Sequence, residues 1–367
     1  MKVYFKILLL FLCVGCQMES KQNPLPVLDF GKVIGKHVPD TFTWNSISKR
    51  IIYLPIATSS NTFFGTAQPV CVAENYCWIV DHKTSTIFQI DKKGNILNSF
   101  CRRGQGPGEY GMISYVHVNE QDSTIQVIDQ RGKKYNIYDW GGRFIRDFSL
   151  KDKNIDLPLL ISDNYIVARG QENIVHKLLV MDKELNIEKT LFPTDTTLTD
   201  MERLCLSWQV NFCRNRDQTI VHYADEDTVF SVTQNEIRPL CLIDKGAYKL
   251  PFDMAKKTVS PNTPYIWSMW FSSLPDHYLA TYICENVVYD EIWSKQSNQI
   301  ISRFSNKDRK FGLPLSLPTG EKIRLNSRTL YVKGSIVATS IDAITAAEGG
   351  VPGVGEDDNP VLVIMEL

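Results

Sequence analysis

The stretch FCRRGQGPGEY, residues 100–110, joins two copies of one strand-rich unit and thereby decides the fold. Four residues of the first copy recur 48 positions later in the second: Asp81, Asp91, Gly94 and Phe100 correspond to Asp129, Asp139, Gly142 and Phe148. Four matches at a single offset indicate an internal repeat. A repeat of about 40 to 50 residues built from short strands is typical of propeller blades.

The same cadence returns further along the chain, at 178–187, 229–233, 287–293 and 361–367. Each unit holds short alternating or β-branched runs between Gly, Asn and Asp turns, a pattern that predicts strands and hairpins. Blades that stack face to face share one apolar core, so a chain of this length can form a single domain. We therefore predict an all-β, six-bladed β-propeller with second strands at 77–81, 125–129, 165–169, 218–222, 278–282 and 335–341.

The last unit ends at Leu367 on what should be its third strand, so its fourth strand must come from elsewhere in the chain. The run IIYL, residues 51–54, is strand-like and belongs to none of the six units. We predict that it completes the last blade, because a ring closed in this way leaves no exposed sheet edge between the first and last blades.

The N-terminus has the features of an export signal. Lys2 and Lys6 form a positively charged segment before the apolar run 7–14. That run is too short for a membrane-spanning helix of about 20 residues. The motif CVGC at 13–16 resembles the lipobox of bacterial lipoproteins, which implies cleavage before Cys16 and lipidation of Cys16. An ordinary secretory signal cleaved elsewhere is the alternative. The predicted organisation is a lipoprotein signal peptide over 1–15, a lipidated cysteine and tether over 16–45, and the propeller over 46–367.

Composition excludes some partners. The chain has 40 basic and 41 acidic residues and no basic tract, so we expect no nucleic-acid ligand. Apart from Cys13 and Cys16 it has seven cysteines, an odd number for an exported protein, with no CxxC pair and no zinc-like spacing. We expect no metal and no cofactor, a monomer, and a membrane contact through the lipid anchor alone.

Two motifs resemble known repeats. The segment 80–96, with VD, TIFQID and GNI, is similar to the second half of an NHL repeat. The loop GQGPGEY at 104–110 is similar to the glycine loop of six-bladed β-propeller lipoproteins of Bacteroides-type bacteria. That resemblance implies the propeller fold and an anchor in the cell envelope, as an outer-membrane lipoprotein on the periplasmic side or the surface. It implies no particular activity.

In a propeller, the connections between blades and the loops from second to third strands open on one face, where functional residues concentrate. The irregular segments 102–110, 245–266 and 342–360 should lie there. The glycine loop has two interpretations: an anion cradle aided by arginines, or a sharp joint between blades. The candidate ligand-binding residues are Arg102, Arg103, Glu109, Tyr110, His117, Arg131, Trp267 and Trp270.

The alternatives at these positions are structural. Each tryptophan could stack on a sugar ring or pack between blades. The acidic turns 225–227 and 356–358 could bind calcium, but neither has EF-hand spacing, and solvated turns are the alternative.

The sequence favours a binding or scaffolding role for a peptide, glycan or protein partner. The alternative is an envelope lyase or hydrolase that acts on glycan or peptide at the channel mouth. Among the histidines, His117 alone falls on a predicted innermost strand, and there is no GxSxG motif, so no catalytic residue is assigned. An enzyme should bring at least two titratable side chains into hydrogen-bond reach in that mouth.

Overall fold

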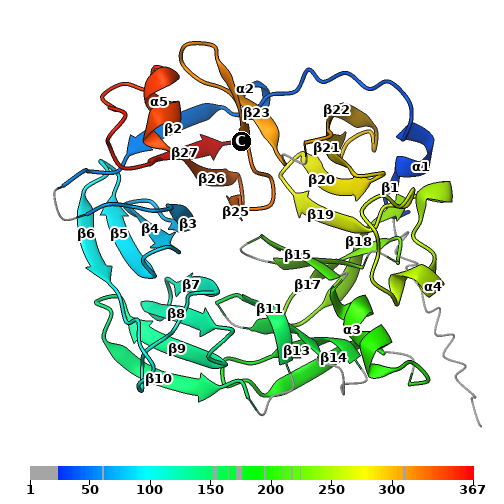
Figure 1. Ribbon diagram of the computed structural model, residues 1–367, viewed down its shortest axis with the longest axis horizontal. Coiled ribbons are helices and arrows are strands. Elements are labelled where there is room, and N and C mark those ends of the chain that lie inside the picture. The colour runs from blue at the N-terminus through cyan, green and yellow to red at the C-terminus, as the bar shows by residue number, and fades with distance from the viewer. Residues whose placement is uncertain are drawn as a thin grey trace, which may run out of the picture.

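The computed structural model describes residues 24–59, 62–151, 155–163, 165–170, 176–193, 196–208, 210–215, 218–223, 225–308 and 311–367. The chain forms a six-bladed β-propeller, and Figure 1 shows the blades arranged in a ring with the blue N-terminal strand β2 beside the red C-terminal strand β27. In each of the first five blades, four consecutive strands pair antiparallel in sequence order from the centre outwards.

The four antiparallel strands of each of the first five blades come from one continuous stretch of chain. Blade 1 holds β3 (Gln68–Val72), β4 (Tyr76–Asp81), β5 (Thr86–Asp91) and β6 (Ile96–Phe100). Blade 2 holds β7 (Tyr115–Asn119), β8 (Thr124–Asp129), β9 (Lys134–Asp139) and β10 (Phe144–Ser149). Blade 3 holds β11 (Ile155–Ile161), β12 (Ile166–Gly170), β13 (His176–Met181) and β14 (Ile187–Pro193).

Blade 4 holds β15 (Val210–Asn215), β16 (Gln218–Tyr223), β17 (Thr228–Val232) and β18 (Ile237–Asp244). Blade 5 holds β19 (Ser268–Ser273), β20 (His277–Cys284), β21 (Val287–Ser294) and β22 (Ile300–Asn306). The six predicted second strands are confirmed, since they coincide with β4, β8, β12, β16, β20 and, in the last blade, β26.

Blade 6 closes the ring as predicted. Its inner three strands are β25 (Tyr331–Lys333), β26 (Ile336–Ile341) and β27 (Val361–Glu366), and its outer strand is β2 (Arg50–Pro55). β2 pairs antiparallel with β27 at six consecutive positions, from Arg50 opposite Glu366 to Pro55 opposite Val361.

The aspartates at the ends of the second strands have the same function in blades 1 and 2. Asp81, at the end of β4, accepts hydrogen bonds from the backbone N–H groups of Gly65 (2.9 Å) and Thr66 (3.1 Å) in the connection that enters blade 1. In blade 2, Asp129 accepts from Gly111 N in the same way, at 2.7 Å. Both aspartates are buried, so each secures a connection whose N–H groups would otherwise lack partners.

The second set of aspartates closes the turn between third and fourth strands. Asp91 accepts from the N–H groups two and four residues later, Lys93 (2.8 Å) and Asn95 (2.9 Å). Asp182 does the same in blade 3, and Asp139 accepts from Arg143 N in blade 2. Short side chains that bond to the backbone just ahead are the usual means of fixing such turns.

The glycines of these turns permit neighbouring blades to approach closely. A Cβ on Gly142 would lie 2.4 Å from the Cγ atom of Phe100 in blade 1. A Cβ on Gly94 would lie 1.9 Å from the carbonyl oxygen of Pro55 in β2. Glycine therefore recurs at positions 94 and 142 because a side chain at either position would clash with the adjacent blade.

Gly94→Ala should destabilise the propeller more than Gly320→Ala. Both glycines have a left-handed backbone, with φ of +87° and +88°, but a Cβ on Gly320 meets nothing within 4 Å. The Gly320 variant should lose about 1 to 2 kcal/mol for backbone strain alone, and the Gly94 variant about 1 to 3 kcal/mol more because Pro55 blocks the new methyl group. Urea unfolding measures both, and equal losses would contradict the close contact.

The N-terminal part of the chain packs on the ring. β1 (Val27–Asp29) pairs parallel with β18 as a fifth strand of blade 4, and is followed by α1 (Phe30–Val33) and α2 (Trp44–Ile47). Phe30 is fully buried and stacks on Trp293, with ring centroids 4.7 Å apart. The tether expected over 16–45 therefore includes residues that belong to the packed structure, because apolar side chains at 28, 30 and 44 are buried. The signal peptide and Cys16 lie outside the described residues.

The connections carry the remaining elements: α3 (Asp200–Trp208), the 3-10 helix Gly246–Tyr248, α4 (Phe252–Ala255), the hairpin of β23 (Leu313–Ser316) and β24 (Lys322–Leu325), and α5 (Ala343–Glu348). The hairpin lies between blades 5 and 6 and was not expected from the sequence. No helix in the described ranges is long and apolar enough to cross a membrane.

Candidate functional site

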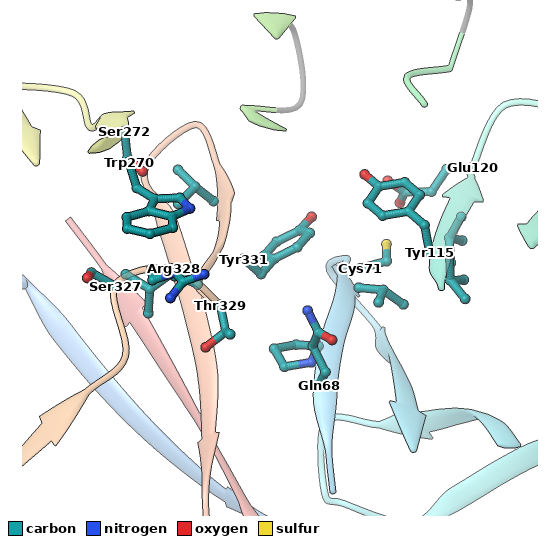
Figure 2. A pocket seen from close by; sticks show the side chains of 16 residues that line it. Gln68, Cys71, Tyr115, Glu120, Trp270, Ser272, Ser327, Arg328, Thr329 and Tyr331 are labelled. Carbon is teal, nitrogen blue, oxygen red and sulfur yellow. The ribbon is translucent and has the colours of Figure 1, made fainter. Parts of the chain in front are cut away.

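A cavity of about 200 Å³ lies at the centre of the ring, and we call it the chamber. Its walls come from the innermost strands β3, β7, β19 and β25 and from the residues just before β25 (Figure 2). The apolar part of the lining is Val70, Val116, Val118, Leu330 and Val332, and the polar part is Gln68, Glu120, Ser272, Ser327, Arg328 and Thr329. Tyr115, Tyr331 and Trp270 add aromatic surface.

A wider depression of about 820 Å³, the mouth, adjoins the chamber. The two share Gln68, Pro69 and Thr329. The mouth is formed by the connections into blades 1 and 6 and by the start of α5, and most of its polar side chains are hydroxyls and amides, such as Thr66, Asn306, Asn326 and Thr345. The mouth and the chamber are therefore adjacent hollows with a shared wall.

Arg328 is the cation of the chamber. Its guanidinium carbon lies 3.7 Å from the ring centroid of Trp270 and 4.6 Å from that of Phe311, so the group packs against two aromatic rings. Desolvation by the surrounding protein lowers the pKa of Arg328, although the side chain is exposed to the chamber. Within the described ranges, no carboxylate forms an ion pair with it.

A buried aspartate of blade 5 holds Arg328 in place. Asp290, which is 1% exposed, accepts hydrogen bonds from the hydroxyl of Ser327 (2.8 Å) and from the backbone N–H of Gly312 (2.8 Å). Burial raises the pKa of Asp290, and these hydrogen bonds oppose that rise. Both ends of the connection that carries the β23–β24 hairpin are thus fixed to β21, which sets the residue after Ser327 against Trp270.

The opposite side of the chamber carries an acid that is already paired. Glu120, at the end of β7, forms a 3.0 Å ion pair with Lys333 of β25 and accepts a hydrogen bond from the Tyr76 hydroxyl at 3.3 Å. Figure 2 shows Arg328 and Glu120 on opposite sides of the chamber, so the chamber is electrostatically polarised.

The glycine loop has the geometry of a joint between blades. The Glu109 carboxylate accepts from Gly106 N at 2.8 Å, which occupies an N–H group that an anion would need. Tyr110 is fully buried, and its hydroxyl donates to Ser85 O (3.0 Å) and accepts from Arg102 N (3.1 Å). Burial strongly raises the pKa of Tyr110, so its hydroxyl stays neutral within the interface.

The other predicted site residues are dispersed. His117 is 1% exposed, with Nε2 2.9 Å from Asp163 Oδ1. Arg102 donates from Nε to the Gly142 carbonyl (3.0 Å), while Arg103 and Arg131 are exposed on the surface. Trp267 packs with an apolar cluster around Leu206 and Leu250. Of the eight candidates, all in the described part of the chain, Trp270 lines the chamber and the other seven line neither the chamber nor the mouth.

The acidic turns form contacts within the protein. Asp227 accepts from Lys249 Nζ at 2.7 Å, and the buried Lys245 donates to the Glu226 carbonyl. Burial lowers the pKa of Lys245 to about 8. Asp358 accepts from Gly355 N within its own loop, at 2.7 Å. Among the described residues, no group of three or more His, Cys, Asp or Glu side chains is placed to hold a metal ion.

Solved structures support the fold. A protein from Bacteroides fragilis NCTC 9343, provisionally described as exported, is 15% identical to this chain, covers 93% of it and 99% of its own length, and has a TM-score of 0.66. A DUF4221 family member from Bacteroides vulgatus is 11% identical, with coverage of 87% and 96% and a TM-score of 0.50. At these identities the likeness concerns the fold. No curated protein matches the chain at a significant level.

A family model matches almost all of the propeller, residues 25–366, including the β1 segment and the ring-closing strand. The chain therefore belongs to the family defined by the domain of unknown function DUF4934.

Proposed function

We propose that this protein is a lipid-anchored binding module of the cell envelope that takes up a peptide segment through the mouth into the chamber. The observation that supports it is the difference in lining between two adjacent hollows: hydroxyl and amide side chains are frequent in the mouth, and apolar side chains are frequent in the chamber. The mouth offers hydroxyls and amides that suit a peptide backbone, and the chamber offers valine and leucine side chains that suit an apolar side chain. Among the described residues, β3, β7 and β25 are the terminal strands of their sheets on the side of the ring centre, so their inner edges can pair with an added strand.

The location rests on separate support. The motif at 13–16 resembles a lipobox, and two acyl chains would give stable membrane binding without a spanning helix. The structural neighbour from Bacteroides fragilis is itself described, provisionally, as exported. We propose attachment to the outer membrane through Cys16, with a monomeric propeller as the binding unit.

The enzymatic alternative has less support. The titratable side chains of the mouth are His82, Asp308, Arg324 and Asp342. None of these four described groups pairs with another: His82 Nε2 contacts the Gln68 amide oxygen (2.6 Å), Arg324 lies over Phe304, and Asp342 caps α5. Acid–base catalysis needs such groups within hydrogen-bond reach of one proton, so binding is the better interpretation of the mouth.

Peptide binding should depend on the passage between mouth and chamber. Thr329 is exposed and lines both, so Thr329→Trp should block the passage without disturbing the core. The full-length protein in detergent would be screened by calorimetry against acetylated tripeptides with varied last residues and against envelope disaccharides. We expect saturable binding of peptides that end in an apolar residue, and loss of that binding in Thr329→Trp.

The matched control is Ile145→Trp, on the exposed face of the outer strand β10, which should bind peptide normally. Peptide binding that survives Thr329→Trp would reject this site. Binding of disaccharides alone, blocked by Thr329→Trp, would keep the site and overturn the peptide. Failure of every tripeptide and disaccharide to bind would overturn the proposed function.

A further inference from the structure

The guanidinium of Arg328 packs against aromatic rings, and the N–H groups along its edge can bind a ligand. Its Cζ atom lies 3.7 Å from the ring centroid of Trp270 and 4.6 Å from that of Phe311, and because the two rings are inclined at 78° to each other, the flat face can lie along one of them only. A planar guanidinium stacked on aromatic rings keeps the N–H groups along its edge, and these match the two oxygens of a carboxylate. The aromatic contact also fixes the plane of the fork, so less side-chain entropy is lost when an anion binds.

Charge in the chamber favours an anion at this position. No described carboxylate neutralises Arg328, whereas Glu120 on the other side is paired with Lys333. A partly desolvated cation without a counter-ion is costly, and an arriving carboxylate offsets that cost. Because Lys333 neutralises Glu120, the cation of the described lining that lacks a carboxylate partner is Arg328, so a ligand with one acidic end should bind with that end on Arg328.

From these observations we infer that the chamber captures the free C-terminus of a peptide, with the terminal carboxylate on Arg328 and the last side chain on the apolar wall. This inference rests on the proposed peptide binding and specifies its ligand. A terminal carboxylate and the last side chain share one Cα atom, so they need a cation beside an apolar surface. The chamber places Arg328 beside Leu330 and Val332, two and four residues further along the same chain segment. The remainder of the peptide would leave through the mouth.

The probe pair is acetyl-Gly-Gly-Leu as the free acid and as the C-terminal amide, which differ only in the group that Arg328 should contact. Titration calorimetry on the full-length protein should show the acid binding about 10- to 100-fold more tightly, as expected for a charge-assisted hydrogen-bonded pair. Arg328→Gln should remove this preference, and Arg328→Lys should retain part of it because lysine supplies charge without the fork.

Arg131→Gln is the matched control, since Arg131 is an exposed arginine away from both the chamber and the mouth, and it should keep the full preference. Equal affinity for acid and amide, with binding still blocked by Thr329→Trp, would overturn the carboxylate contact and leave the proposed function intact. Binding of neither peptide would overturn both. Binding of glucuronate that depends on Arg328, without binding of the peptide acid, would overturn the C-terminal assignment.

Discussion

Deletion of residues 50–55 is expected to abolish the cooperative unfolding transition of the propeller. These residues form β2, the outer strand of blade 6, and their loss would leave the outer edge of β27 without its six paired positions. It would also remove Leu54, which is 5% exposed and packs with Leu362 and Ile364. The combined loss should exceed about 5 kcal/mol, which is comparable with the whole stability of many domains.

The length-matched control is deletion of 17–22, a polar stretch that the sequence assigns to the tether, and this variant should melt like the parent. Thermal unfolding followed by far-UV circular dichroism compares the two. A synthetic peptide of residues 48–57 added to the shortened protein should restore part of the transition, because an open sheet edge accepts a strand. Equal melting temperatures for the two deletions would show that β2 does not close the ring.

The sequence predicts the blades because their signals are local. Asp81 and Asp91 each accept hydrogen bonds from backbone N–H groups within about 20 residues of chain, and Asp129 and Asp139 do the same in blade 2, so this short-range need appears in the sequence as a repeat. Ring closure could be predicted by counting strands, because the strand-like run 51–54 belongs to no unit and the last blade lacks its fourth strand.

The chamber could not be predicted in the same way. Arg328 reaches Trp270 because Asp290, 37 residues before Ser327, holds the returning connection in place. No periodic pattern in the sequence of residues 307–330 predicts the contact between Arg328 and Trp270. Trp270 could be named from the sequence because an exposed aromatic ring can stack on a ligand, but its partner depends on tertiary structure. β1 could not be predicted either, because its three residues are too few to show the alternation of a strand.

Arg303→Met is expected to destabilise the propeller by about 3 to 5 kcal/mol, the usual cost of removing one partner of a buried ion pair. Arg303 Nε donates to Glu291 Oε1 at 2.7 Å, and Glu291 is fully buried. The same guanidinium donates from Nη1 to the Val33 carbonyl at 2.8 Å, so it also fastens the N-terminal segment to blade 5. Urea unfolding at neutral pH measures the loss.

The pH dependence of that loss identifies its cause. Burial raises the pKa of Glu291, and Arg303 opposes the rise, so in Arg303→Met the folded-state pKa should climb further. A carboxyl group whose pKa is higher in the folded state than in the unfolded state stabilises below the unfolded value and loses that contribution as pH rises. The defect of Arg303→Met should therefore grow between about pH 5 and pH 8, by the linkage of proton binding to folding.

The double variant Glu291→Gln with Arg303→Met removes the buried charge and should recover part of the stability. Tyr282 and Trp293 donate to different oxygens of the carboxylate in the parent, so in the variant Trp293 can still donate to the amide oxygen while the Tyr282 hydroxyl accepts from the amide NH2 group. The difference between the double variant and the parent should no longer grow with pH. A loss in Arg303→Met that is constant with pH and unchanged in the double variant would mean that the arginine acts through packing and the Val33 contact. In that case the buried charge would contribute nothing measurable to the attachment of the N-terminal segment.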